Sequence, residues 1–404
     1  MTTVDQAASS TSVPGRPQTG LAPQPRRLTG VRTTDVLALV GALVAAFSTT
    51  GLLWTQIAPF SGLIGYIVLT WGLFVLFYGV LVSFDQNGPA VRDRVISVVV
   101  HSLGALVLLA LVYVIAYTFF RGWRALVHLN FYVQDLRTTG PLSPLTQGGV
   151  FHAIVGTLIE VAIAMGIAVP LGLLAAVYMQ EVPGTLSRFV RTVVDAMTAL
   201  PDVLAGLFIY ATLILFLHRG FFGFAAGCAL AVTALPIVAR AAYVVLRLVP
   251  GGLTEASYAL GSGQWRTVWH VMLPTARSGL ATAVILGTAR AIGETAPVLL
   301  TAGVSEYLNW NPFSGPMMSL PLLAYLRVAS PEKNEIARGF GSACVLLVLV
   351  LLLFVTARAI GGRGPGQLTP RQQRRRALGS RRDLARFDRY LAAAQAAGYL
   401  GEET

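Results

Sequence analysis

Long stretches of apolar residues dominate the chain, and shorter polar segments separate them. A helix needs about 20 apolar residues to cross the hydrocarbon core of a bilayer. The pattern therefore predicts an all-α polytopic membrane protein with about eight transmembrane helices. The expected spans are residues 36–56, 62–83, 95–119, 151–179, 189–217, 221–248, 278–301 and 339–361.

Three of the longer apolar runs contain a proline, at Pro170, Pro201 and Pro236. Proline removes a backbone donor and its ring clashes with the preceding turn, so each position predicts a kink or a break. Broken helices at membrane depth are tolerated where they line protein or a water-filled cavity. Plain bending of a continuous helix is the alternative at each of the three positions.

Positive charge gathers in alternate polar segments, which share one side of the membrane with both chain ends if the spans alternate in direction. By the positive-inside rule that side is the cytoplasm. We therefore expect a multi-pass protein of the cell (inner or plasma) membrane with both termini cytoplasmic. The residues on that side are Arg16, Arg26, Arg27, Arg32, Arg92, Arg94, Arg188, Arg191, Arg266, Arg277, Arg374, Arg375, Arg376, Arg381, Arg382, Arg386 and Arg389.

The segment 121–149 departs from this trend, because it places Arg121, Arg124 and Arg137 on the opposite side. Trp123 in the same segment suits an aromatic belt at the membrane interface. The segment 304–337 balances acids against bases, as an outer loop would, with Glu306, Glu332, Glu335, Arg327 and Lys333.

Composition agrees with a bilayer environment. The 404-residue chain is 55% hydrophobic and only 12% charged, with a net charge of +12, whereas soluble domains carry about 25% charged residues. Charge confined to loops and tails favours contact with anionic lipids over nucleic acid, since no aromatic-rich basic module accompanies it. Cys228 and Cys344 lie inside apolar runs and give neither a disulfide framework nor a metal-ligand spacing.

The two ends of the chain read as basic cytoplasmic tails. Residues 1–34 are rich in Pro, Gly, Ser, Thr and Arg and predict a disordered tail. In the tail 362–404, Leu384, Phe387 and Leu391 fall on one helical face. That face would lie on the inner leaflet, bind a partner or remain solvated.

The loop between the sixth and seventh spans carries a distinct pattern: Glu255-Ala256-Ser257, then Gly261, then Leu273-Pro274. It predicts a short helix with Glu255 in its first turn, a left-handed glycine that ends it, and a proline that begins the next span. Small and apolar residues exposed on such a loop suggest a helix presented to a partner's groove. Packing of the loop against its own bundle is the alternative.

Two arginines, Arg240 and Arg290, lie inside apolar spans, where a charge costs roughly 2.5–3.5 kcal/mol to insert. Arginine suits phosphate because its planar fork donates two parallel hydrogen bonds. Glu294 follows Arg290 by four residues on the same helical face, so an internal ion pair is the structural alternative. Further acids that could pair with Arg240 are Glu160, Asp195 and Asp202.

Threonines recur along the seventh span, at Thr288, Thr295 and Thr301. Their hydroxyls could replace water around a dehydrated oxyanion. More often, threonines in such helices bond back to their own backbone.

The pattern from Glu255 to Pro274 resembles the signature loop of ABC importer permeases, with its spacing kept. Ser257 stands where the family has a second alanine, and Val271 where it has isoleucine. The resemblance implies a coupling helix, formed here by Glu255, Ala256, Ser257, Gly261, Leu273 and Pro274, that docks onto a separate ATP-binding subunit.

Within that class, the segment 288–297 resembles the Arg-Ala-Ile-Gly-Glu-Thr-Ala-Pro segment of phosphate importer permeases of the PstA type. The segments 148–158 and 221–250 are also similar to that family, and the resemblance runs from about 130 to 360. One departure is Asp202, which follows Leu200-Pro201 where the family usually has serine. An acid beside an anion path would repel phosphate.

The resemblance implies a domain organisation. A type I ABC importer permease core of about six helices occupies 95–361, with its signature region at about 150–361 and the coupling loop at 250–277. The two helices within 35–94 are additions to that core, since they lie outside the resemblance.

The resemblance also implies a function: transmembrane permease subunit of an ATP-driven phosphate importer, working by alternating access. The expected partners are ATP-binding cassette subunits, a second homologous permease and an extracytoplasmic phosphate-binding protein. No Walker-type phosphate loop is present in the sequence, so the chain itself is not expected to be an enzyme or to bind a cofactor or metal, and ATP is expected on the partner. The substrate path is expected at Arg290, Glu294, Arg240 and Thr295.

Other readings stay open from the sequence. A permease for another oxyanion, such as sulfate or molybdate, fits the same pattern. A secondary transporter would need an ion site and would leave the 250–277 loop unexplained. A membrane-embedded enzyme would have to use His101 and His152, which are joined by no metal-ligand or nucleophile constellation and suit interfacial or packed positions better.

Overall fold

The computed structural model describes residues 33–57, 62–361 and 370–396. All regular structure within these ranges is helical, which confirms the predicted all-α class. Seven of the described helices are long and apolar enough to cross a membrane, and a bent helix pair raises the number to eight. The chain is therefore a multi-pass membrane protein. Most of the predicted N-terminal tail, 1–34, lies outside the described residues.

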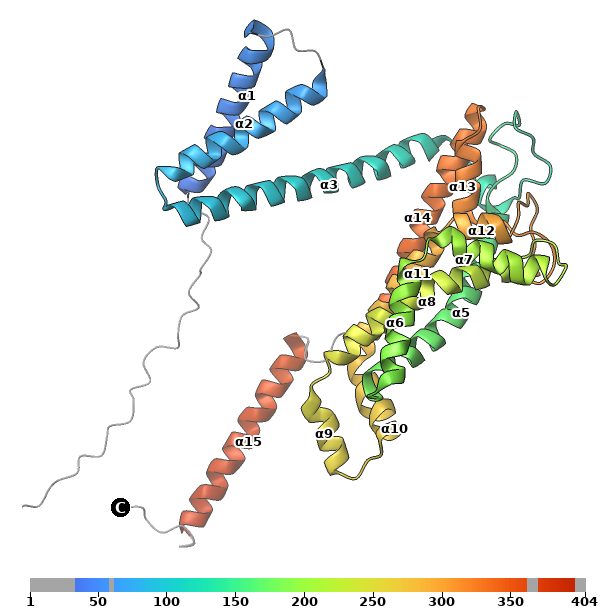
Figure 1. Cartoon of the computed structure of the whole chain (residues 1–404). Helices are drawn as coiled ribbons and strands as arrows, with labels where there is room; N and C mark the ends of the chain where they lie inside the picture. Colours follow the sequence, from blue (N-terminus) through green and yellow to red (C-terminus); the bar gives the residue numbers. More distant parts are fainter. Residues whose placement is uncertain (1–32, 58–61, 362–369, 397–404) are drawn as a thin grey trace, which may run out of the picture. The chain divides into compact units, whose positions relative to one another are not determined.

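The first of two compact units runs to Tyr113. Helix α1 (Thr33–Leu52) continues as a short π-helix (Leu53–Ile57) and is followed by α2 (Leu63–Ser83) and the first part of α3 (Gly88–Leu126). Figure 1 draws α1 and α2 in blue and α3 in teal.

A small apolar core holds the first unit together. Ala42 of α1 packs with Tyr78 and Val82 of α2. Arg94 of α3 forms an ion pair with Asp35 at the start of α1. The two predicted additional helices thus pair with each other and are fastened to α3 by a salt bridge.

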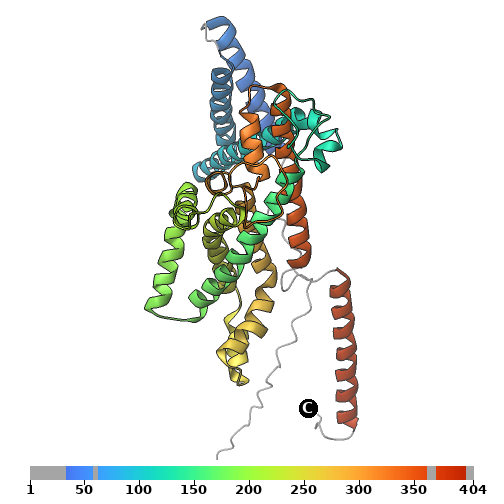
Figure 2. The same cartoon turned by 90° about the vertical axis from the view of Figure 1, so that its right-hand side faces the viewer.

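The second unit begins at Val114, within α3. Most of its helices are gathered into one bundle (Figures 1 and 2) and contribute side chains to a shared apolar core. The helices of this unit are α4 (Asn130–Val133), α5 (Phe151–Glu181), α6 (Thr185–Ala199), α7 (Asp202–Ile209) with the π-helix Tyr210–Leu215, α8 (Gly223–Arg247), α9 (Gly251–Ala259), α10 (Gln264–Thr267) with the π-helix Val268–Met272, α11 (Leu273–Gly293), α12 (Ala296–Thr301), α13 (Leu320–Val328), α14 (Lys333–Gly361) and α15 (Pro370–Ala396).

Helices α5 and α8 form the centre of this unit and lie against each other through small residues. A β-carbon on Gly227 of α8 would stand 2.5 Å from the Ile163 side chain of α5. A β-carbon on Gly172 of α5 would stand 3.0 Å from Val238 of α8. Close backbone approach at small residues is the usual way in which helices associate in a bilayer, where apolar burial gives little drive.

The three intramembrane prolines behave differently. Pro170 and Pro236 lie inside the helices α5 and α8, which continue through them. At these two positions the alternative of an unbroken helix therefore holds. Pro201 separates α6 from α7, and the two helices are bent by 102°. The predicted span 189–217 is therefore a broken span or a re-entrant pair.

The predicted span 278–301 needs a correction, because α11 ends at Gly293 and α12 begins only at Ala296. The physical reason is Pro297. It has no amide hydrogen to continue the ladder, and its ring would clash with the carbonyl four residues earlier, at Gly293. The interruption places Glu294 and Thr295 in a two-residue break.

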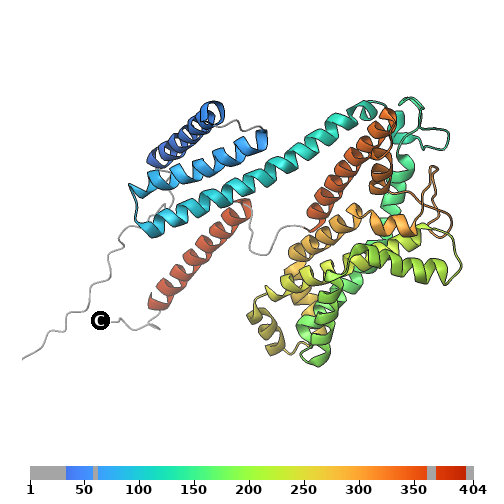
Figure 3. The same cartoon turned by 45° about the horizontal axis from the view of Figure 1, so that its top comes forward.

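Polar segments mark the two ends of the second unit. Helices α9 and α10 lie at one end, and the loops that flank α4 and α13 lie at the other (Figures 1 and 3).

Helix α15 falls within the predicted basic tail, 362–404. Arg375, Arg382 and Arg386 lie along one side of it, and Leu384 and Phe387 lie on the opposite side at the helical period of 100° per residue. All five side chains are exposed. The helix is amphipathic, as the sequence indicated, and its contact with a leaflet stays a prediction.

Candidate functional site

The segment 250–277 forms a helical hairpin at one end of the second unit. Pro250 precedes α9, and Glu255, Ala256 and Ser257 lie within that helix. Glu255 is not in the first turn, contrary to expectation, because the helix already starts at Gly251. The helix-dipole argument for Glu255 therefore fails, and the carboxylate lies on the second turn.

Gly261 ends α9 in the predicted left-handed conformation, with φ of 79°. The Gly261 amide donates to the Tyr258 carbonyl at 2.9 Å, and the Ser262 amide donates to the Ser257 carbonyl at 3.1 Å. This pair of bonds is the Schellman motif. A side chain at Gly261 would meet no neighbour within 4 Å, so backbone conformation alone favours glycine here.

Side-chain bonds fix the hairpin internally. The hydroxyls of Ser257 and Thr267 lie 2.8 Å apart in a buried contact between α9 and α10. Gln264 donates to the Glu181 carbonyl at 2.9 Å and so fastens α10 to the end of α5. Serine at position 257 thus takes part in a bond that alanine could not make.

Several large apolar side chains are exposed on the outer surface of the hairpin. Leu260 is 87% exposed, and the rings of Trp265 and Trp269, both more than half exposed, stand edge to face at 5.8 Å. Exposed large apolar groups at a polar end of the unit suit a protein partner.

One continuous helical segment joins the hairpin to the membrane interior. Residues Gln264–Gly293 pass through α10, the short π-helix and α11 without a break. Leu273 and Pro274 lie inside this segment, where the π-helix passes into α11, and Pro274 supplies no amide hydrogen to the helical ladder there. The segment carries Arg290 in its last turn.

Arg290 lies between two helix breaks and binds an acid at each. Its guanidinium contacts Glu294, just beyond α11, at 2.9 Å, and it also pairs with Asp202, the first residue of α7. Both breaks are close in space, since a β-carbon on Gly206 of α7 would stand 2.7 Å from Pro297 of α12. One arginine therefore bridges two interrupted spans.

A cavity of about 280 Å³ opens beside this triad. Asp202 and Arg290 line it, together with Thr198 of α6 and Thr233 and Pro236 of α8. The Arg290 side chain is 46% exposed and that of Asp202 28%. Arg290 and Asp202 are thus accessible from a space lined by α6, α7, α8 and α11.

The other residues predicted for the substrate path do not line this cavity, and two of the threonines bond to the backbone of their own helices. Arg240 of α8 pairs with Asp195 of α6 at 3.3 Å, and both are half exposed or more. Thr288 and Thr301 donate to carbonyls of their own helices at 2.8 and 2.7 Å, the structural alternative. Thr295 lies in the break next to Glu294.

The ion pairs show which acidic residue binds each of the two intramembrane arginines. Asp195 pairs with Arg240, and Asp202 with Arg290. Glu160 of α5 is fully buried, and among the described residues its Oε1 atom has no hydrogen-bond partner. His152 is also buried in α5, as a packed histidine would be.

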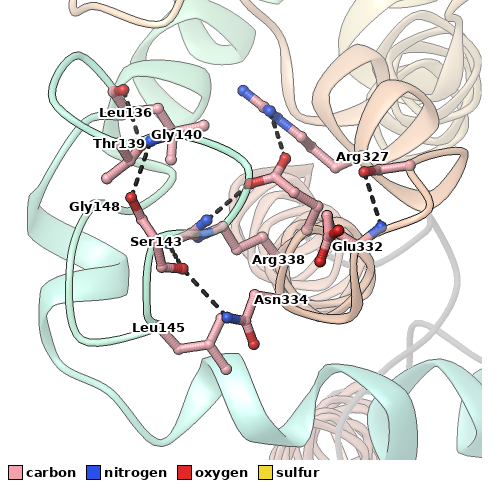
Figure 4. Close-up of polar contacts among 12 residues, drawn as sticks. Leu136, Thr139, Gly140, Ser143, Leu145, Gly148, Arg327, Glu332, Asn334 and Arg338 are labelled. Atoms are coloured by element: carbon pink, nitrogen blue, oxygen red, sulfur yellow. Dashed lines mark hydrogen bonds and ion pairs between the residues drawn. The ribbon is translucent and has the colours of Figure 1, made fainter.

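Sequence reasoning missed a second arginine cluster, which is centred on Arg338 and drawn in Figure 4. Arg338 of α14 is 1% exposed. Its guanidinium donates to Glu335 at 2.8 Å and to the carbonyls of Ser143, Pro144 and Gln147 at 3.2, 2.9 and 3.0 Å.

Neighbouring groups complete this cluster. Arg327 of α13 pairs with Glu335 and, at 2.6 Å, with Glu306. Asn334 donates to the Ser143 carbonyl at 3.3 Å, as drawn in Figure 4. The sequence showed Glu306, Glu335 and Arg327 as balanced charges of the segment 304–337, but it gave no pairing among them and did not point to Arg338. The loop carbonyls that Arg338 binds are nearly 200 residues away in sequence.

Comparison with known proteins gives the family. Residues 168–361 match the family model described as binding-protein-dependent transport system inner membrane component. The phosphate transport system permease protein PstA 1 of Mycobacterium tuberculosis is 39% identical over 254 residues, which cover 63% of this chain and 83% of that relative.

Two further relatives carry the name phosphate transport system permease protein PstA. The one from Mycobacterium leprae is 36% identical and covers 64% of this chain and 85% of its own length, and the one from Xylella fastidiosa is 36% identical and covers 56% and 79%. Among solved structures, an inward-facing MetNI methionine ABC transporter matches with 22% identity and a TM-score of 0.41, over 53% of this chain and 93% of that one. The chain belongs to the PstA-type family of ABC importer permeases.

Proposed function

We propose that this chain is the transmembrane permease subunit of an ATP-driven phosphate importer and that it moves inorganic phosphate inward by alternating access. The observation that carries the proposal is Arg290, held between two helix breaks beside a cavity, in a chain 39% identical to a PstA permease. Arginine is well suited to phosphate, since its fork matches the anion's oxygens.

The α9 hairpin is the docking site for an ATP-binding cassette subunit in this proposal. Its exposed Leu260, Trp265 and Trp269 supply an apolar face of the kind that aromatic anchors use in protein interfaces. ATP binds and is hydrolysed on that partner, and this chain binds no cofactor of its own. The hairpin end and both termini are cytoplasmic by the charge distribution.

Movement at the hairpin reaches the substrate site along a single helix. From Gln264 to Arg290 the segment is helical throughout, about 40 Å at 1.5 Å per residue. A shift of the hairpin on closure of the ATP-binding subunits therefore moves Arg290 relative to Asp202, which belongs to another helix. Separation of that pair would free the guanidinium to bind an anion.

Asp202 fits phosphate better than it fits sulfate. Its charge is compensated by Arg290 when no anion is bound, so the repulsion expected from an isolated acid is reduced. Inorganic phosphate keeps a proton on oxygen near neutral pH and can donate it to a carboxylate, whereas sulfate has none to give. A site with an acceptor for that proton rejects an anion that lacks it.

The remaining partners are proposed from the family. A second, homologous permease completes the pore, and an extracytoplasmic phosphate-binding protein delivers the substrate. Anionic lipids of the inner leaflet contact the arginine side of α15, where each basic residue near such a surface contributes about 1 kcal/mol.

Uptake of radiolabelled phosphate tests the proposal, in cells whose only phosphate importer contains this chain. Gly261→Asp is expected to abolish uptake and to reduce the amount of ATP-binding subunit that co-purifies. Arg290→Gln is expected to abolish uptake while the complex still co-purifies. Normal uptake with both variants would contradict the mechanism. Uptake of sulfate or molybdate in preference to phosphate would contradict the substrate.

A further inference from the structure

The second unit contains a larger cavity, of about 850 Å³, at the end opposite the α9 hairpin. It lies between the last turns of α3 and the first turn of α14. All its described lining residues belong to the second unit. The volume falls within the range of about 300–1,000 Å³ that small-molecule sites occupy.

Three cations line this cavity: Arg121, Arg124 and Lys333. Among the described residues its lining includes no acid. Arg121 stands over the Phe340 ring at 5.6 Å, which fixes its guanidinium. Within the described part of the chain, no carboxylate forms an ion pair with any of the three. Glu335, the nearest acid along α14 that is buried, is already bound by Arg327 and Arg338.

The rest of the wall is apolar. Phe119, Phe120, Trp123 and Ile336 line it, and Phe120 and Trp123 are 79% and 64% exposed. A hydrated inorganic ion would gain nothing from such a wall. An amphiphile with an anionic headgroup and acyl chains would satisfy both kinds of surface.

The membrane boundary expected from the sequence runs close to this cavity. The expected spans stop at residue 119 in α3 and begin at residue 339 in α14, and with those bounds the cations would stand just beyond the hydrocarbon, at the depth of the lipid headgroups. Trp123 has the character of an interfacial belt residue. A headgroup layer at that depth would give Arg121 and Arg124, which depart from the positive-inside trend, an anionic partner.

We propose that this cavity binds the phosphodiester headgroup of an anionic phospholipid, with Arg124 and Lys333 as its principal charge partners. The aromatic wall formed by Phe119, Phe120 and Trp123 holds the first part of the acyl chains. This proposal does not depend on the transported substrate, because the cavity is separate from the one beside Arg290.

The test uses the full chain, purified in detergent and stripped of lipid. Native mass spectrometry counts bound phosphatidylglycerol, and a thermal unfolding titration gives its apparent dissociation constant. We expect saturable binding of phosphatidylglycerol, weaker binding of phosphatidylcholine, and no saturable response to inorganic phosphate. In the double variant Arg124→Gln/Lys333→Gln, the dissociation constant should rise about tenfold or more, since each lost charge contact is worth about five- to tenfold.

Arg137→Gln is the matched control, because Arg137 lies at the same end of the unit, over Tyr307, and outside this cavity. It should leave the dissociation constant unchanged. Equal binding in the double variant, or an equal loss in the control, would overturn the proposal. So would a response to inorganic phosphate that the double variant abolishes, which would indicate a free-anion site. Cross-linking of Phe120→Cys to a second permease without retained lipid would assign the cavity to that subunit instead.

Discussion

The two arginine clusters of the second unit use the same side chains for opposite purposes. Arg338 is 1% exposed, and its donors meet a carboxylate and three backbone carbonyls. The Arg290 side chain is nearly half exposed and borders a cavity, and within the described residues its partners are two carboxylates. Backbone carbonyls cannot leave without refolding the loop, whereas the carboxylate of Asp202, which lies on a separate helix, can. The comparison teaches that the nature of the acceptors separates a structural arginine from one able to exchange its partner.

The largest expected effect is on stability and concerns Arg338. Arg338→Gln should lower the free energy of unfolding by about 3–5 kcal/mol, because it removes one of the two cations that bind the buried Glu335 carboxylate and takes the charged donor away from three loop carbonyls. Arg290→Gln should lower it by about 1 kcal/mol or less, because that cluster is partly solvated. Unfolding in mixed micelles measures both. Similar losses for the two variants would erase the distinction.

Phosphate uptake should depend strongly on Arg290, although that residue contributes little to stability, and only weakly on Arg240. Arg290→Gln should reduce phosphate uptake about a hundredfold, the cost of losing a bidentate charge-assisted contact. Arg240→Gln, at the peripheral pair with Asp195, should reduce uptake less than about threefold, since exposed pairs contribute little. Initial uptake rates at matched expression levels check this. A larger loss from Arg240→Gln would move the substrate path to α6 and α8.

Asp202 tests the comparison further, because in the proposal its carboxylate releases Arg290 and then accepts a hydrogen bond from phosphate. Asp202→Asn should lower the preference for phosphate over sulfate about tenfold, since asparagine can donate to either anion and no longer requires the proton of phosphate. Competition of unlabelled sulfate against labelled phosphate uptake measures the ratio. An unchanged ratio would mean that Asp202 serves only to balance the charge of Arg290.

An effect of similar size to that of Asp202→Asn extends the comparison to the far end of the helix that carries Arg290. Gly261→Ser should weaken co-purification of the ATP-binding subunit by about five- to thirtyfold, because a side chain in the left-handed region costs about 1–2 kcal/mol. Gly263→Ser is the matched control. Gly263 has φ of −71°, and a β-carbon on either glycine would meet no other atom within 4 Å. Equal behaviour of the two would remove the argument from backbone conformation.

The sequence predicted most of the membrane-crossing helices, because apolar length is a local property. It also predicted the hairpin around Gly261, since glycine and proline act on their own backbone. It did not predict the break at Glu294, because an apolar run hides the effect of Pro297. It named Asp202 and Arg290 without pairing them, since 88 residues separate the two. Arg338 was missed because its acceptors are backbone atoms of a distant loop.

In the uninterrupted helix from Gln264 to Gly293, the number of residues sets both the length of the segment and the direction in which its side chains point. One residue inserted between the hairpin and Arg290 would lengthen it by about 1.5 Å but would turn everything beyond by about 100°. The guanidinium would then face lipid or another helix instead of the cavity. Four inserted residues would bring it back to within about 40° of its original azimuth. The length of this stretch is therefore constrained by angle more tightly than by distance.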